Sequence, residues 1–141
     1  MKTITITAVV TLGLTFTAGP AAASIGSDDP CTQGSNAEMG TCYKKEQMRI
    51  NAETDALANK IATEFRKEAQ DPAMKGVVAD TLRKAANTVK RSQQTWKVYR
   101  DQHCMAVAYS WTTGSGASTA YQRCLLHLGQ NRLRELRSEF Q

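Results

Sequence analysis

The fold is decided by residues 43–65, which read YKKEQMRINAETDALANKIATEF. Apolar side chains recur there at intervals of seven, seven, four and four residues: Tyr43, Ile50, Leu57, Ile61 and Phe65. Because an α-helix has 3.6 residues per turn, this spacing places them on one face. Charged residues fill much of the rest, so the stretch predicts one long amphipathic helix with a buried side.

A helix start signal precedes this stretch. Ser35 is followed three positions later by Glu38, the pattern of a capping box, in which each residue satisfies a backbone N–H of the other. We therefore expect the first helix to begin here and to end near Ala69. Residues 24–34 are rich in Gly, Ser, Asp and Pro and predict a flexible lead, which leaves residues 35–141 as the helical domain.

A second helix is expected to start at Asp71-Pro72, because Asp can cap a helix and Pro is favoured in its first turn. It should run to about Ser110. Its predicted apolar face comprises Met74, Val78, Leu82, Ala85, Val89, Trp96, Tyr99 and His103. From Val78 onward the spacing is close to a heptad, which is typical of helices packed lengthwise.

Residues 112–118, TTGSGAS, contain two glycines and no apolar period, and predict a loop. A third helix is expected from about Thr119 to Glu139, with an apolar side made of Tyr121, Leu125, Leu128, Leu136 and Phe140, and with Leu133 beside it. Gly129 costs this helix about 1 kcal/mol relative to Ala, which close packing or a bend would explain. With no strand pattern and no repeat, the sequence predicts an all-α fold, a small antiparallel bundle of about three long helices.

The first 23 residues have the organisation of an export signal. A basic start, Met1-Lys2, precedes an apolar stretch, and Ala21-Ala22-Ala23 offers the small residues that a signal peptidase needs. The apolar stretch is too short and too polar to span a bilayer. We expect cleavage near Ala23 and a soluble protein in the periplasm or outside the cell; a buried N-terminal element is the alternative.

Four cysteines remain, Cys31, Cys42, Cys104 and Cys124. An even number in a small exported domain predicts two disulfides, but three pairings are possible and spacing alone does not choose between them. The alternative is a metal site built from Cys104, Cys124 and the histidines close to them in sequence. Export to an oxidising compartment favours disulfides, and we expect no metal.

Composition limits the function classes. The chain has 141 residues, 22% of them charged, and a net charge of +5, which suits one domain and argues against a disordered charged tail. Basic residues gather only weakly, at Arg83-Lys84 and Lys90-Arg91. A solvated helix face is the default interpretation; contact with anionic lipid or peptidoglycan is the alternative, and export argues against nucleic acid.

Enzyme chemistry has no recognisable machinery in this sequence. Only two histidines occur, with no histidine–carboxylate spacing, no G-x-S-x-G and no phosphate-binding loop. No pair of carboxylates stands out as a buried acid and base. We therefore predict a protein that is not an enzyme and needs no cofactor.

The most distinctive run is residues 93–104, QQTWKVYRDQHC, which reads Q-x-x-W-x-x-Y-R-D-x-x-C. Downstream, Cys124 is followed by Arg132 and Leu136; upstream lie Cys31 and Cys42. Over about residues 31–137 this pattern resembles the LprI-type lysozyme inhibitor family, small exported bacterial helical proteins. In the first helix Asp55 and Asn59 fit the family pattern, whereas Ala58 and Ala62 stand where Leu and Tyr are typical.

The resemblance implies local disulfides, Cys31–Cys42 and Cys104–Cys124. Of the signature residues, we expect Trp96 and Tyr99 to pack in the core. Arg100 and Asp101 are adjacent, so we expect them not to pair with each other along one helix face. Each should instead reach a neighbouring helix, with Arg132 or Arg123 as partner for Asp101 in a structural ion pair.

The resemblance also implies a function: an exported binding protein that inhibits lysozyme-type cell-wall hydrolases by occluding the active-site cleft. The residue 112–118 loop, with its small polar residues, is the predicted inserted element. Predicted partner contacts are His103, Thr113, Ser115 and Arg123, because such donors suit the two carboxylates of a glycosidase cleft. The alternative is a periplasmic structural or interaction module without inhibitor activity, with an exposed apolar patch around Trp111.

Overall fold

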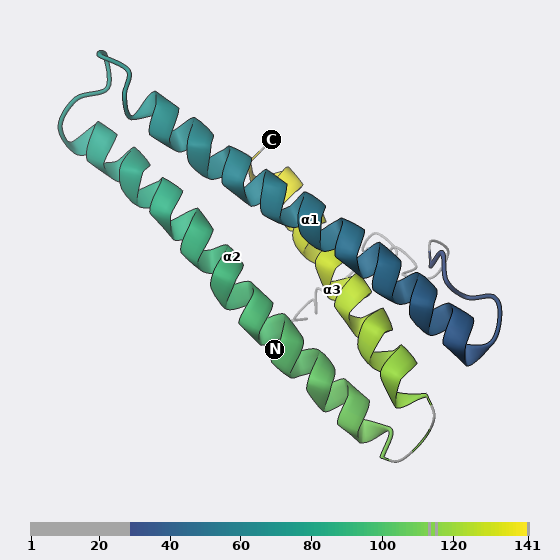
Figure 1. The fold of residues 1–141 in the computed structure, drawn as a ribbon. Helices are drawn as coiled ribbons and strands as arrows, with labels where there is room; N and C mark the ends of the chain where they lie inside the picture. Colours follow the sequence, from purple (N-terminus) through teal and green to yellow (C-terminus); the bar gives the residue numbers. More distant parts are fainter. Residues whose placement is uncertain (1–28, 113, 115, 141) are drawn as a thin grey trace, which may run out of the picture.

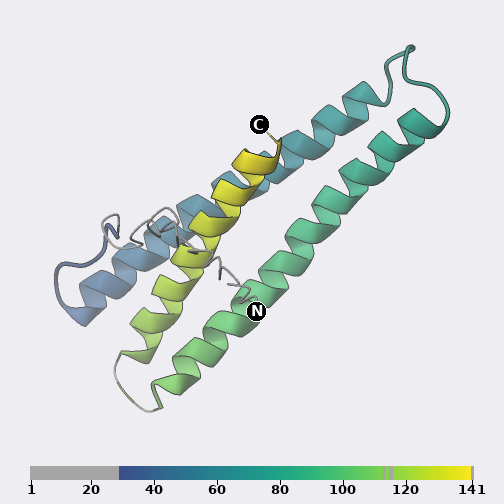
Figure 2. The ribbon, with the colours of Figure 1, turned by 180° about the vertical axis from the view of Figure 1, so that it is seen from behind.

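The computed structural model describes residues 29–112, 114 and 116–140. These residues form three long helices and no strand: α1 (Asn36–Glu68), α2 (Val77–Ser110) and α3 (Ala117–Phe140). Successive helices run antiparallel, and α3 packs against both α1 and α2 (Figure 1, Figure 2). The predicted all-α bundle is confirmed. The predicted export signal, residues 1–23, lies outside the described part of the chain.

The helices differ in length, and this gives the bundle two unlike ends. At one end α1 and α2 form a hairpin that continues beyond the C-terminal end of α3 (Figure 1). At the other end all three helices meet, because α1 and α3 begin there and α2 ends there. Both disulfides lie at this second end, which we call the disulfide end.

The start of α1 is as predicted. The Ser35 hydroxyl accepts a hydrogen bond from the backbone N–H of Glu38 at 3.4 Å, and the Glu38 carboxylate accepts one from the Ser35 N–H at 2.8 Å. The capping box therefore satisfies backbone donors that a helix terminus leaves without intrahelical partners.

The predicted start of α2 at Asp71-Pro72 is wrong. The Asp71 carboxylate accepts a hydrogen bond from the Ala73 N–H at 2.8 Å and so closes a local turn. The helix begins only at Val77, after Gly76, whose φ of 60° turns the chain into the new direction. The same residue types that cap helices also stabilise turns, which is why the sequence signal pointed to the wrong residue.

The core consists of two clusters along the bundle. One contains Cys31, Tyr43, Ile50, Leu126 and Leu133. The other contains Ala58, Ile61, Val89 and Leu136. The predicted apolar faces of α1 and α3 supply most of these side chains. Phe140 keeps 42% of its surface exposed and packs its ring edge-on against Phe65, at 6.2 Å between centroids.

The predicted face of α2 is partly wrong. Val78, Tyr99 and His103 are exposed. Val89 is buried as predicted; the other buried positions are Ala79, Ala86, Gln93, Arg100 and Cys104. At one end of this face small alanines allow close packing, and at the other end lie polar residues with partners on other helices. The spacing of apolar residues therefore did not predict which side of α2 is buried.

Among the residues that the structure describes, none of the helices is both long and apolar enough to cross a membrane.

Candidate partner-binding groove

The signature residues of α2 form hydrogen bonds inside the bundle. Nη1 of Arg100 donates to the Asn51 side chain on α1 at 2.5 Å, while Nε and Nη2 donate to Asp101 at 2.8 and 2.6 Å. The Arg100 guanidinium also lies 5.1 Å from the ring centroid of Trp96, within the range of a cation–π contact. The expectation that Arg100 and Asp101 do not pair is therefore wrong, because the long arginine side chain folds back to its neighbour.

A second polar chain connects all three helices. Nε of Arg132 on α3 donates to the side-chain oxygen Oε1 of Gln93 at 3.2 Å. The side-chain nitrogen Nε2 of Gln93 in turn donates to Asp55 on α1 at 3.0 Å. Nη1 of Arg132 pairs with Glu135 at 2.6 Å. Neither Arg132 nor Arg123 is the partner of Asp101, contrary to prediction.

These contacts give the signature a structural role. Trp96 is half-buried, and Arg100 and Arg132 are buried with their donors satisfied. Tyr99 is exposed and stacks beside His103, at 5.6 Å between ring centroids, rather than packing in the core as predicted. Arg100 and Arg132 therefore hold the helices in register, whereas Tyr99 and His103 face outward.

The two disulfides pair as the resemblance implied. Cys31–Cys42 joins the segment before α1 to α1 itself, and Cys104–Cys124 joins α2 to α3. Each of the four sulfurs is thus part of a disulfide, and none is a free thiol that could bind a metal. Covalent links at this end limit the motion of the three helix termini that meet there.

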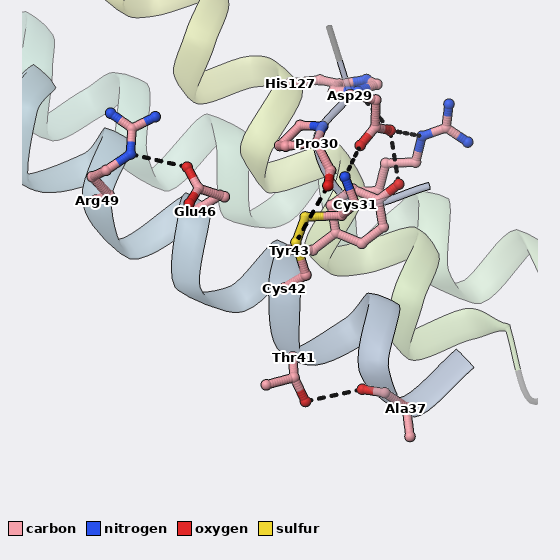
Figure 3. The surroundings of a disulfide bond; sticks show 11 residues. Asp29, Pro30, Cys31, Ala37, Thr41, Cys42, Tyr43, Glu46, Arg49 and His127 are labelled. Atoms are coloured by element: carbon pink, nitrogen blue, oxygen red, sulfur yellow. Dashed lines mark hydrogen bonds and ion pairs between the residues drawn. A yellow bond between two sulfur atoms is a disulfide. The ribbon is translucent and has the colours of Figure 1, made fainter. Parts of the chain in front are cut away.

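A carboxylate that the sequence did not single out anchors the segment before α1. Asp29 accepts a hydrogen bond from the Tyr43 hydroxyl at 2.7 Å, and the same oxygen lies 3.3 Å from Nε of Arg123 and 3.7 Å from Nε2 of His127. Figure 3 shows Asp29 and Tyr43 directed toward each other beside the Cys31–Cys42 disulfide. Burial, together with the Asp29 carboxylate, raises the pKa of Tyr43 from 10.0 to about 12.

A groove of about 680 Å³ opens at the disulfide end between the three helices. His103 on α2 and Arg123 on α3, both predicted partner contacts, line the same groove. Its walls are largely apolar, and the charged or titratable residues among its described lining are Arg123, two histidines and Tyr43. Asp29, which is not part of that lining, pairs with Arg123 and lies near His127. The predicted contacts Thr113 and Ser115 lie outside the described residues.

Trp111 forms one edge of this groove at the end of α2. Its side chain lies over Gly116, where a Cβ atom would come within 2.8 Å of the ring, and the residue as a whole keeps 53% of its surface exposed. Thr112, which follows it, has a φ of 53°, an uncommon backbone conformation for a β-branched residue. The sequence indicated an apolar patch around Trp111 but gave no sign that it would border a groove.

Fold and groove together define a small, disulfide-bonded three-helix protein with an amphipathic groove at its disulfide end. A sequence model of the family described as "Lysozyme inhibitor LprI" matches residues 27–136, and the chain therefore belongs to the LprI family. This is a family of inhibitors, usually exported, and not of enzymes. No curated protein and no solved structure is significantly similar to the chain.

Proposed function

We propose that the protein is an exported inhibitor of lysozyme-type cell-wall hydrolases and that it occludes their active-site cleft with its disulfide end. Family membership over residues 27–136 supports the class of partner. The signal-like first 23 residues and the oxidised state of all four cysteines support a location beyond the cytoplasmic membrane.

One observation carries the choice of surface. His103 and Arg123 come from different helices, yet they line one groove that has an exposed tryptophan at its edge and no carboxylate in its described lining. Lysozyme-type glycosidases carry two carboxylates in their cleft. Nε of Arg123 pairs with Asp29, but a guanidinium has further N–H donors, and these donors together with the imidazole of His103 and the exposed Trp111 ring suit such a cleft. Trp and Arg are also the residue types that most often dominate protein–protein binding energy.

Rigidity favours this surface as well. The Cys104–Cys124 bond joins α2 to α3 within two helical turns of the end of α2 and of the start of α3, and Asp29 holds Nε of Arg123 at 3.3 Å. A surface that is ordered before binding loses less conformational entropy on association. The groove can therefore act as a preformed surface.

The test is a cell-wall clearing assay with several lysozymes. Wild-type protein in micromolar excess should slow at least one of them. Arg123→Gln and Trp111→Ala should each weaken that inhibition by about tenfold or more. The matched controls are Arg134→Gln, an exposed arginine on α3 outside the groove, and Val98→Ala on α2. If no lysozyme is slowed, the protein is not an inhibitor of these enzymes. If the control variants weaken inhibition and the groove variants do not, the groove is not the binding surface.

A further inference from the structure

The side of α2 that faces away from the bundle has an unusual composition. The inner side repeats every seven residues, at Ala79, Ala86, Gln93 and Arg100. Five positions beyond each, about 140° around the helix, lies an outward-facing line that also repeats every seven residues, at Lys84, Arg91, Val98 and Met105. We call these four residues and Tyr109 the outer line of α2. It is cationic in its first half and apolar in its second.

The apolar half is openly exposed. Val98 keeps 57% of its surface accessible, Met105 41% and Tyr109 73%. Outward positions of a bundle helix are normally polar, because they gain nothing from burial in the fold. These three side chains are not part of the core clusters. Their exposed apolar surface is therefore free to contact an apolar surface outside the protein.

The cationic half has little local compensation. Lys84 and Arg91 form no ion pair with any residue that the structure describes. The two carboxylates on this side of the helix already have partners: Asp80 pairs with Arg83 and Asp101 pairs with Arg100, both at 2.6 Å. The outer line therefore presents positive charge on a protein whose net charge is +5.

We propose that the outer line of α2 docks on the surface of an anionic lipid bilayer. Lys84 and Arg91 face the headgroup phosphates, and the apolar half enters the boundary between headgroups and acyl chains. From residue 84 to residue 105 a helix extends about 31 Å, and α2 presents this length along one side of the bundle (Figure 2). A soluble polyanion would use the cations but leave the exposed apolar side chains without a role.

This orientation leaves the groove accessible. His103, a groove residue, lies five positions after Val98 and therefore about 140° around the helix from it. A protein docked through its outer line would direct the disulfide-end groove away from the bilayer. Binding to lipid and binding to a hydrolase are thus separate properties of two faces, and each can fail without the other.

The test is co-sedimentation of the purified, oxidised protein with phosphatidylcholine vesicles with and without phosphatidylglycerol. Binding is expected only with phosphatidylglycerol and should weaken at high salt. Lys84→Gln/Arg91→Gln and Met105→Ser/Tyr109→Ser should each weaken it by about tenfold. Matched controls on α1, Lys44→Gln/Lys45→Gln and Met48→Ser, remove similar groups from another face and should have little effect.

Three results would overturn the proposal: no binding to anionic vesicles, equal weakening by the α1 controls, or loss of binding in the cation variant alone. The last would indicate recognition of charge without insertion. Circular dichroism checks that each variant stays helical, and Met105→Gln and Tyr109→Gln singly replace the double variant if it does not. Inhibition of lysozyme in solution should be unchanged in all outer-line variants, which separates this proposal from the proposed function.

Discussion

Gly129 of α3 packs directly against Ile50 of α1: a Cβ atom on Gly129 would lie only 2.8 Å from Cγ2 of Ile50. Both residues are buried, and Ile50 belongs to the first core cluster. The missing side chain lets the two helices pack, which explains why a residue with poor helix propensity lies inside α3.

Gly129→Ala should therefore destabilise the protein by about 1–3 kcal/mol, because the added methyl group overpacks the core. Gly40→Ala in α1 is the matched control. Its Cβ would meet only the Thr119 hydroxyl, at 3.7 Å, so the better propensity of Ala should stabilise the helix by about 0.5–1 kcal/mol. Urea unfolding followed by circular dichroism measures both. A Gly129→Ala variant as stable as the control would show that the helices can separate without cost.

We expect Gln93 to contribute more to the free energy of unfolding than a single polar side chain usually does. It accepts from Arg132 and donates to Asp55, and it is buried. Gln93→Ala should cost about 2–3 kcal/mol, because it leaves a buried guanidinium without one of its acceptors. Gln94→Ala, at the exposed neighbouring position, should change the free energy of unfolding by less than about 0.5 kcal/mol. Equal effects would mean that the polar chain across the helices carries no stability.

The raised pKa of Tyr43 predicts a loss of stability at high pH. The unfolded chain releases this proton near 10.0, whereas the folded protein retains it up to about 12. The stabilisation is therefore complete below pH 10 and is lost as pH rises from there through about 12. Tyr43→Phe should remove a titration step near 12 from the tyrosinate absorbance and flatten the fall in stability over that range. The idea fails if the wild-type and variant absorbance curves differ only near pH 10.

The helical fold could be predicted because α1 and α3 bury their apolar residues at regular spacing. The register of α2 could not be predicted in the same way. Its inner heptad positions hold Ala79, Ala86, Gln93 and Arg100. An apolar pattern cannot identify a buried arginine, one of whose partners, Asn51, lies 49 residues away in the sequence.

The candidate groove was predicted in part. Arg123 and His103 were identified as donors near the turn, and the structure brings them to one groove. Asp29 gave no signal, because its sequence context is that of a loop and its partners, Tyr43, Arg123 and His127, come together only through the folding of α1 against α3. Long-range contacts of this kind are not encoded in local spacing.

Each disulfide joins two cysteines that are consecutive in the sequence, with separations of 11 and 20 residues. An oxidising enzyme that meets the cysteines in the order in which they emerge during translocation would form the native bonds directly. The protein should then mature without help from a disulfide isomerase, and cells lacking that enzyme should still accumulate it in its fully oxidised form.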